Sequence, residues 1–151
     1  MMRNVSDFRP FQPFDNEACL ALFDQNCPDY FAPNERREFA QYLYVQGHEY
    51  RVYEHRGKIG AAFGLHVYSD GHSARINWIM AARNSHKAGI GTVMMHTAIA
   101  NAKRHPHVKL IHISASQHSA SFFTRFGAAQ KTIIENGWGP GMHRIEMEIV
   151  L

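Results

Sequence analysis

Residues 86–95, "HKAGIGTVMM", place two glycines at the beginning of an expected helix. Gly89 and Gly91 each cost roughly 0.5–1 kcal/mol relative to alanine inside a helix, so helix stability does not explain them. The first turn of a helix has unpaired backbone N–H groups and a partial positive charge, which together attract anions. Glycines there allow a phosphate to contact the backbone. The stretch therefore predicts a phosphate or pyrophosphate site, with a tight strand-to-helix turn in a packed core as the alternative.

Two familiar nucleotide-binding motifs do not fit this stretch. A phosphate loop of the form G-x-x-x-x-G-K-[ST] is absent from the sequence. A dinucleotide fingerprint needs a third glycine after Gly89 and Gly91, where Met94 stands instead.

The elements that would position this loop follow from hydrophobic periodicity. Asp15 and Asn34 are expected to cap two helices, which precede a hairpin turned at residues 56–58. Residues 74–81 alternate as a half-buried strand, and the helix that begins in the glycine stretch should end near Arg104, before Pro106. The expected order is β-α-α-β-β-β-α-β-α-β-β, which implies an α/β sandwich with a mixed sheet. The expected elements are 5–11, 16–26, 34–45, a hairpin over 49–68, 74–81, a helix ending near 104, 108–115, 119–127, 131–136 and 143–151.

Composition limits the class of protein. The chain has 151 residues, 45% of them hydrophobic and 19% charged, which predicts a single globular domain over residues 1–151. The net charge of +3 comes from 16 scattered Lys and Arg, a balance that suits a small anionic ligand and predicts no nucleic acid partner.

Compartment and metal content are also predicted from residue usage. The N-terminal sequence has no apolar targeting or membrane segment, so we expect a cytoplasmic protein without a membrane partner. Cys19 and Cys27 are interpreted as packing residues in a reducing compartment. Among 11 histidines, His105 and His107 lack a nearby Cys or carboxylate set, so no metal is expected.

Two segments carry a family resemblance. "ARINWIMAARNSHKAGIGTVMMHTAIANAKR" followed by "HISASQHSASFFTRFGA" resembles the GNAT acetyltransferase superfamily, over about residues 51–151. The family loop Q/R-x-x-G-x-G/A falls on His86, Gly89 and Gly91. A second family segment of the form F-Y-x-x-x-G-F falls on "FFTRFGA", residues 122–128. The resemblance implies a GNAT-like α/β (α+β) fold, with a mixed, mostly antiparallel sheet of six to seven strands and about four helices.

The resemblance also implies acetyl-CoA as co-substrate. The strands that end near Ala81 and Ser114 should separate and leave a crevice for the thioester. The end of the strand near Ala81 should bind the pantetheine arm, and the glycine loop should bind the pyrophosphate. The implied CoA-binding residues are Met80, Ala81, Ala82, His86, Lys87, Ala88, Gly89, Ile90, Gly91, Thr92, Ser114, Gln117, Phe122 and Phe123.

Two positions depart from the family pattern. His86 replaces the usual Gln or Arg of the loop. Phe123 stands where many members have a tyrosine that protonates the CoA thiolate, and phenylalanine has no proton to donate. The acid is then expected among Ser116, Ser121, Thr124 and bound water, unless the thiolate leaves unprotonated.

The implied reaction is direct attack of a primary amine, on a small molecule or peptide, at the acetyl carbonyl. Such an amine is mostly protonated at pH 7, so a base must remove a proton. Residues 75–81 contain no carboxylate, and the candidate bases are His112, Asp70, His72 and Glu35. The alternatives are an inactive acyl-CoA-binding or regulatory domain of the same fold, and a protein that binds another phosphorylated ligand. The oligomer is expected to be a monomer or homodimer.

The acceptor pocket has two further candidates. Residues 136–147, "NGWGPGMHRIEM", are expected to form a structured loop that either borders the pocket or is a rigid surface turn. In the first case Trp138 forms a wall, with His143 or Arg144 as polar contacts. The aromatic residues Tyr30, Phe31, Phe39, Tyr42 and Tyr44 either line the same pocket or form helix packing faces.

Overall fold

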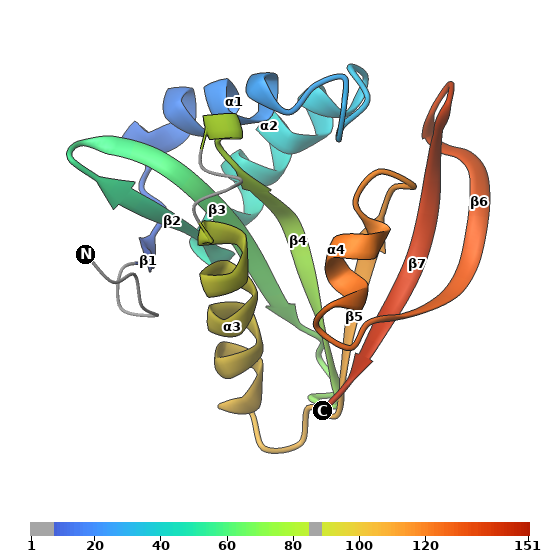
Figure 1. The fold of residues 1–151 in the computed structure, drawn as a ribbon. Coiled ribbons are helices and arrows are strands. Elements are labelled where there is room, and N and C mark those ends of the chain that lie inside the picture. The colour runs from blue at the N-terminus through green and yellow to red at the C-terminus, as the bar shows by residue number, and fades with distance from the viewer. Residues whose placement is uncertain (1–7, 85–88) are drawn as a thin grey trace.

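The computed structural model describes residues 8–84 and 89–151, which form one seven-stranded sheet with four α-helices (Figure 1). The strand order is β1-β2-β3-β4-β5-β7-β6, and only β4 and β5 pair in parallel. The predicted element order and the predicted mixed, mostly antiparallel sheet are confirmed. The elements are β1 (Phe8–Pro10), α1 (Asn16–Gln25), α2 (Glu35–Gln46), β2 (Tyr50–His55), β3 (Lys58–Val67), β4 (Ser73–Ala81), α3 (Ile90–Lys103), β5 (Leu110–Ala115), α4 (Ala120–Thr124), β6 (Ala129–Gly139) and β7 (Met142–Val150), with 3-10 turns at Pro13–Asp15 and Gly47–Glu49.

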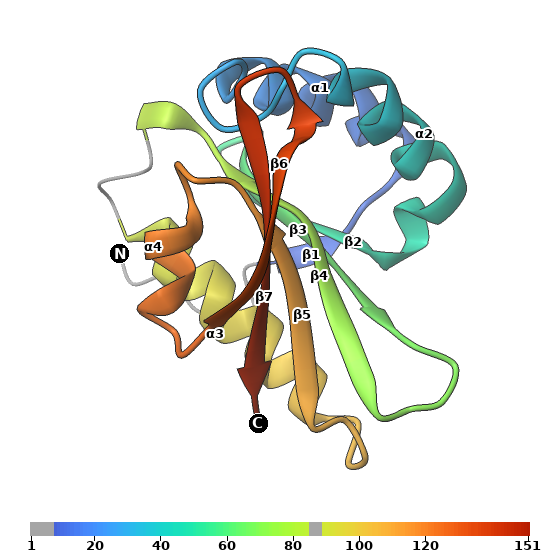
Figure 2. The same cartoon turned by 90° about the vertical axis from the view of Figure 1, so that its right-hand side faces the viewer.

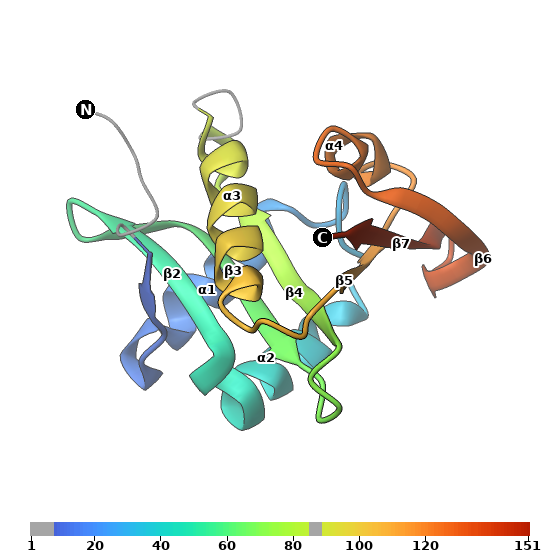
Figure 3. The same cartoon turned by 90° about the horizontal axis from the view of Figure 1, so that it is seen from below.

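The helices cover both faces of the sheet. Helices α1 and α2 lie on one face and α3 on the other (Figure 3). Each face has its own hydrophobic cluster: Phe23 and Phe39 belong to the one under α1 and α2, and Met95 and Phe123 to the one under α3 and α4. The sheet is therefore a central layer, and any passage through it connects two separate environments.

Such a passage exists between β4 and β5. Their parallel pairing runs from Ser73 with Leu110 to Ile76 with Ile113, and no pair beyond it is formed among the described residues. Figure 1 shows the two strands diverging from this point toward their carboxyl ends. The predicted separation of these strands is confirmed.

Strand β4 has a β-bulge at Trp78. Its register with β3 shifts between the pairs Ala62–Met80 and Gly64–Asn77, and Trp78 has a positive φ of 50°. The Tyr50 hydroxyl donates a 2.6 Å hydrogen bond to the Trp78 carbonyl, which holds this conformation. A bulge leaves the ladder locally disrupted and turns the strand, so it changes which backbone groups face the gap. The simple alternation predicted for residues 74–81 is therefore interrupted.

The β6–β7 hairpin corrects one prediction. Residues 136–147 do not form a long loop, because β6 continues to Gly139 and β7 begins at Met142. Asn136 has a φ of 53° and its Oδ1 accepts a 2.7 Å hydrogen bond from the Gly141 N–H. The strand can therefore bend and still pair, which glycine-rich composition alone did not indicate. The tip of the hairpin lies beside Ala32 and Asn34, which precede α2 (Figure 2).

Asp15 and Asn34 occupy the predicted N-cap positions of α1 and α2, but neither side chain makes a capping hydrogen bond. The Asp15 carboxylate accepts hydrogen bonds of 2.8 and 2.9 Å from the Arg9 guanidinium and makes no side-chain cap of α1. The Asn34 side chain instead donates a 2.8 Å hydrogen bond to the Trp138 carbonyl. Long-range partners therefore use the polar groups that local sequence assigned to helix ends.

Candidate active site

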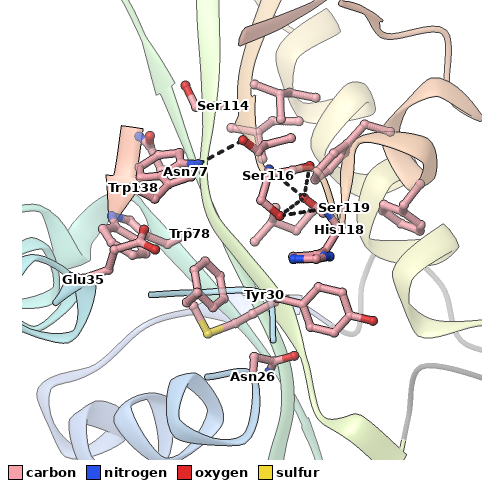
Figure 4. Close-up of a pocket in the computed structure, with 18 of the residues that line it drawn as sticks. Asn26, Tyr30, Glu35, Asn77, Trp78, Ser114, Ser116, His118, Ser119 and Trp138 are labelled. Carbon is pink, nitrogen blue, oxygen red and sulfur yellow. Dashed lines mark hydrogen bonds between the residues drawn. The ribbon is translucent and has the colours of Figure 1, made fainter. Parts of the chain in front are cut away.

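A cavity of about 570 Å³ occupies the gap between β4 and β5. Its lining comes from both faces of the sheet and from the β6–β7 hairpin (Figure 4). The lining residues are Asn26, Tyr30, Phe31, Glu35, Glu38, Arg75, Ile76, Asn77, Trp78, Ile79, Met80, Ala81, Gly91, Met94, Ile113, Ser114, Ala115, Ser116, His118, Ser119, Phe122, Phe123, Trp138 and Arg144.

The two glycines at the start of α3 have different structural reasons. Gly89 precedes the helix with a φ of 79°, a conformation that favours glycine. A Cβ on Gly91 would lie 3.1 and 3.2 Å from two ring atoms of Phe122, so this position permits close approach of α3 and α4. Gly91 lines the cavity at this helix N-terminus, where backbone N–H groups attract anions.

The predicted CoA-binding residues divide into three groups. Met80, Ala81, Gly91, Ser114, Phe122 and Phe123 line the cavity. His86, Lys87 and Ala88 lie outside the described residues. Ala82, Gly89, Ile90, Thr92 and Gln117 lie outside the lining set.

Gln117 has a structural role that competes with cofactor binding. Its Nε2 donates a 2.8 Å hydrogen bond to the Gly141 carbonyl, and its Oε1 accepts one of 2.9 Å from the His143 N–H. Both polar groups of this side chain therefore attach the end of β5 to the β6–β7 hairpin.

Ser116 lies between the end of β5 and α4. It is buried and lines the cavity together with Phe123. Its Oγ accepts a 3.1 Å hydrogen bond from the His118 N–H and lies 3.4 Å from the Ser119 Oγ. Figure 4 shows this serine pair and His118 on one side of the cavity, with Glu35 and Trp138 on the other.

The other predicted acids are placed away from the cavity. Ser121 and Thr124 are exposed, and the Thr124 hydroxyl donates to the Ser121 carbonyl at 2.7 Å. Among the three hydroxyl groups expected as acids, only Ser116 belongs to the cavity lining.

Three of the four candidate bases also lie outside the cavity lining. Asp70 is exposed in the turn between β3 and β4, where it accepts a 2.9 Å hydrogen bond from the His72 N–H. His112 projects from β5 and forms a 3.6 Å ion pair with Glu148. The turn that contains Asp70 and His72 precedes β4, whereas the cavity lies at the opposite, diverging end of this strand.

Glu35 is the candidate base that lines the cavity. It is the first residue of α2, is 3% exposed, and accepts a 2.7 Å hydrogen bond from the Ala32 N–H. Burial raises its pKa to about 7, although the Ala32 hydrogen bond opposes this shift. A carboxyl with such a pKa exchanges protons at neutral pH, which suits a general base.

Trp138 borders the cavity, as one of the two interpretations of its segment predicted. Its indole Nε1 donates a 2.9 Å hydrogen bond to the Ala115 carbonyl, and its own carbonyl accepts from Asn34. The Arg144 guanidinium lies 4.9 Å from the ring centre, within the range of a cation–π contact. The hairpin is thereby attached to both β5 and α2 at one end of the cavity.

Some of the aromatic residues singled out in the sequence line the cavity, and others pack in the hydrophobic core. Tyr30 and Phe31 line the cavity, whereas Phe39 and Tyr42 are buried in the cluster under α1 and α2. Tyr44 is 92% exposed, so it belongs to neither group.

Several lining residues were not predicted. Asn26 is buried, and its Nδ2 donates hydrogen bonds of 2.9 Å to the carbonyls of Leu22 and Ala81. It therefore attaches α1 to the end of β4. His118 is a second lining residue that was not predicted, and together with the predicted Tyr30 it also borders a second, more open hollow. These residues come from loops, and no local pattern in the sequence indicates which loops meet.

A polar network at the point of strand divergence was also missed. The Ser114 Oγ donates to Glu146 at 2.8 Å and accepts from the Arg75 Nη1 at 2.7 Å. Arg144 binds the same carboxylate through its Nε. Burial favours the neutral form of Glu146, but hydrogen bonds from Ser114 and Arg144 hold its pKa below the usual value. Ser114 thus uses its hydroxyl within this network.

Two further observations concern metals and membranes. Within residues 8–84 and 89–151, no three His, Cys, Asp or Glu side chains are grouped to hold a metal ion. Over the same residues, every helix is too short or too polar to cross a bilayer.

The fold has counterparts among known proteins. Residues 16–128 match the model of the acetyltransferase (GNAT) family, and the chain belongs to this family. No curated protein matches the sequence closely enough to add to this result.

Solved structures share the fold at low sequence identity. Ard1 from Thermoplasma volcanium superposes with a TM-score of 0.79 and 14% identity, covering 95% of this chain and 96% of that chain. Ribosomal-protein-alanine N-acetyltransferase from Brucella melitensis gives 0.69 and 17%, covering 95% and 99%. N-acetylglutamate synthase from Neisseria gonorrhoeae, complexed with coenzyme A and N-acetyl-glutamate, gives 0.76 and 14%, covering 95% and 34%.

Proposed function

We propose that this protein transfers an acetyl group from acetyl-CoA to a primary amine of a small molecule or peptide. The observation that carries the proposal is the cavity between β4 and β5, which opens the sheet between a helix N-terminus on one face and a buried carboxyl on the other. Family membership supports the donor, and a solved structure with the same fold holds coenzyme A.

The donor is assigned to the α3 side of the cavity. Met80, Ala81 and Ala82 at the end of β4 would follow the pantetheine arm. The start of α3 would bind the pyrophosphate, with its backbone N–H groups as donors. The expected contributions of His86, Lys87 and Ala88 remain part of this proposal. The CoA side needs no metal, because the helix terminus itself supplies positive potential.

Glu35 is proposed as the base. A protonated amine that enters the cavity would lose its proton to the Glu35 carboxylate, which burial has made more basic than an exposed carboxylate. The neutral amine nitrogen then forms a bond to the acetyl carbonyl carbon, and the carbon–sulfur bond breaks. Backbone N–H groups near Ala81 are proposed to stabilise the charge on the carbonyl oxygen.

Ser116 is proposed to protonate the departing CoA sulfur. Phe123 has no exchangeable proton, and the buried Ser116 contributes a hydroxyl to the same cavity lining. Serine would recover its proton from the new amide nitrogen as that nitrogen loses its excess proton, directly or through water. Glu35 releases the proton that it took from the ammonium group to solvent, so each turnover forms the amide and the CoA thiol and releases one proton.

The test is release of free CoA thiol from acetyl-CoA with a panel of primary amines. We expect thiol release above background for at least one amine, and a loss of at least tenfold in kcat/KM for Glu35→Gln. Phe123 favours a second candidate, an acyl-CoA-binding or regulatory domain without catalysis. That candidate predicts an acetyl-CoA-dependent rise in melting temperature with no thiol release for any amine.

A further inference from the structure

The acceptor side of the cavity has charged groups of both signs. Glu35 and Glu38 line it from the first turn of α2. Arg75 lines it from β4 and Arg144 from β7. A ligand that neutralises both regions must carry both a positive and a negative group.

The two arginines share one carboxylate. The Glu146 carboxylate is bound by Arg144 and lies 3.7 Å from the Arg75 Nη2, and both guanidinium groups contact the Ser114 Oγ. These groups hold the pKa of Glu146 below its usual value, so it is ionised at neutral pH. Two guanidinium groups share the one carboxylate that they contact directly, and the other carboxyl group that acts on Arg144 is Glu35, whose ionised form Arg144 favours.

The guanidinium groups also retain hydrogen-bond donors. Each guanidinium has five N–H donors. Arg75 uses two of them, on the Tyr68 hydroxyl and the Ser114 Oγ, and Arg144 uses two, on Glu146 and the Ser114 Oγ. Within the part of the chain that the structure describes, three N–H donors on each arginine make no hydrogen bond, and the Arg75 Nη2 lies 3.7 Å from Glu146. Guanidinium donors of this kind match the two oxygens of a carboxylate.

The position of Arg75 indicates at which end of the gap the anionic group of a ligand would bind. Arg75 pairs with His112 where β4 and β5 are still hydrogen bonded, so it lies at the narrow end of the gap. The strands are farthest apart at their carboxyl ends (Figure 1). An anion bound at the narrow end would leave an attached amine free to extend toward Glu35 and the wide end, where the thioester is proposed to lie.

The enclosure favours a small acceptor. The cavity of about 570 Å³ must contain the thioester end of CoA as well as the acceptor. The Trp138 ring lines it, and bonds from Trp138 to Ala115 and from Asn34 to Trp138 hold the hairpin across one end. The attached hairpin therefore limits the space for an acceptor at this end of the cavity.

From these observations we infer that the acceptor is a small amino acid, whose carboxylate binds Arg75 and Arg144 and whose amine faces Glu35. This inference rests on the proposed acetyl transfer for its identification of the ligand as an acceptor. The carboxylate adds a second negative charge, beside that of Glu146, where the two guanidinium groups meet. The ammonium group faces the carboxyl groups of Glu35 and Glu38.

The test is binding to the CoA complex, which requires no turnover. Individual amino acids, their carboxamides and their decarboxylated amines are titrated by calorimetry into the protein saturated with CoA. We expect at least one amino acid to bind at least tenfold more tightly than its carboxamide. Arg144→Gln and Arg75→Gln should reduce this preference to less than threefold. Arg83→Gln is the matched control, because Arg83 pairs with the exposed Asp29 and lies outside the cavity lining, and it should keep the full preference.

A second variant tests the charge balance. Glu146→Gln removes the shared carboxylate and preserves its size, so the preference for the free carboxylate should persist or increase. Equal binding of amino acids and carboxamides, or no binding of any amino acid at millimolar concentration, would overturn the inference. Thiol release is then measured with the same compounds. Carboxylate-dependent binding without thiol release would defeat the proposed catalysis and still support the amino acid site.

Discussion

Gly91 and Phe122 meet across the gap between α3 and α4, because a Cβ on Gly91 would lie 3.1 Å from the Phe122 ring. The absence of a side chain at Gly91 therefore has two effects. It allows the two helices to approach, and it leaves the N-terminal turn of α3 open toward the cavity. A substitution there should affect ligand binding through the ring as well as through the backbone.

We expect Gly91→Val to weaken CoA binding by more than tenfold, equivalent to about 1.4 kcal/mol. The valine side chain would displace Phe122 into the space proposed for the ligand. Calorimetry measures the affinity, and Ala100→Val, at an exposed position later on the same helix and outside the cavity lining, is the control with an affinity within twofold of the parent. If the ring carries the effect, adding Phe122→Ala to Gly91→Val should recover part of the lost affinity. Unchanged CoA affinity in Gly91→Val would show that this turn does not hold the ligand.

Replacing Glu35 with glutamine should lower activity and raise stability. Burial raises its pKa in the folded protein from the ordinary value of 4.5 to about 7. The folded protein therefore holds a proton that the unfolded chain releases, and the free energy of unfolding falls as pH rises from about 4.5 to 7. Glu35→Gln removes the titrating carboxyl group, so the free energy of unfolding no longer falls with pH for this reason. We expect the variant to gain stability at pH 8, on the order of 3 kcal/mol, while it loses catalysis.

Urea unfolding at pH 5 and pH 8 measures this effect. Glu17→Gln, an exposed position on α1, should show the same pH dependence as the parent. In the parent, kcat/KM should rise with pH and level off above about 7, because the ionised carboxylate is the active form. A Glu35→Gln variant that keeps both the pH dependence of stability and the activity of the parent would rule out this assignment.

The Asn26 side chain links α1 to the end of β4, so replacing it should affect both stability and activity. Asn26→Leu would leave the Ala81 carbonyl without the hydrogen bond from Nδ2, and we expect a loss of about 1–3 kcal/mol in unfolding free energy. The kcat should also fall, since Ala81 belongs to the proposed thioester site. The control is Gln25→Ala, because Gln25 makes a comparable but exposed bond of 3.2 Å to the Arg83 N–H, and its loss should be less than about 0.5 kcal/mol. A similar cost for both variants would show that burial at Asn26 is unimportant.

The extent to which the sequence predicts this molecule depends on the range of the interactions. Periodicity is local, and it predicted the element order and the mixed sheet. The glycine motif is local too, and it located the start of α3. Ser114 and Glu146 are a direct cross-strand pair of β5 and β7. That pairing depends on strand order, so the charged network around it could not be derived from spacing along the chain.

The same reason explains the misassigned polar residues. Asp15 and Asn34 have the residue types of helix caps, yet Arg9 and the Trp138 carbonyl bind them. Gln117 was expected at the cofactor, and the β6–β7 hairpin occupies both of its polar groups. In each case a partner from another element competes for the side chain. Glu35 was one of four equivalent bases by sequence, and only its burial in the folded chain separates it from the others.

Ser116 and Phe123 together predict a rescue experiment on the leaving group. Ser116→Ala should lower kcat by at least tenfold if its hydroxyl protonates the CoA sulfur, with little change in the affinity for CoA. Ser119→Ala is the control, since it removes the neighbouring hydroxyl 3.4 Å away, and its kcat should stay within threefold of the parent. Equal losses in both variants would instead indicate that the serine pair shapes the turn before α4.

Phe123→Tyr then places a phenol at the family's tyrosine position beside the same cavity. In the Ser116→Ala background this second substitution should restore kcat at least fivefold, because a phenol supplies the missing proton, and rapid-quench measurement of CoA thiol release would detect it. No recovery, with the tyrosine variant folded and binding CoA as tightly as the parent, would show that protonation of the sulfur does not limit the reaction.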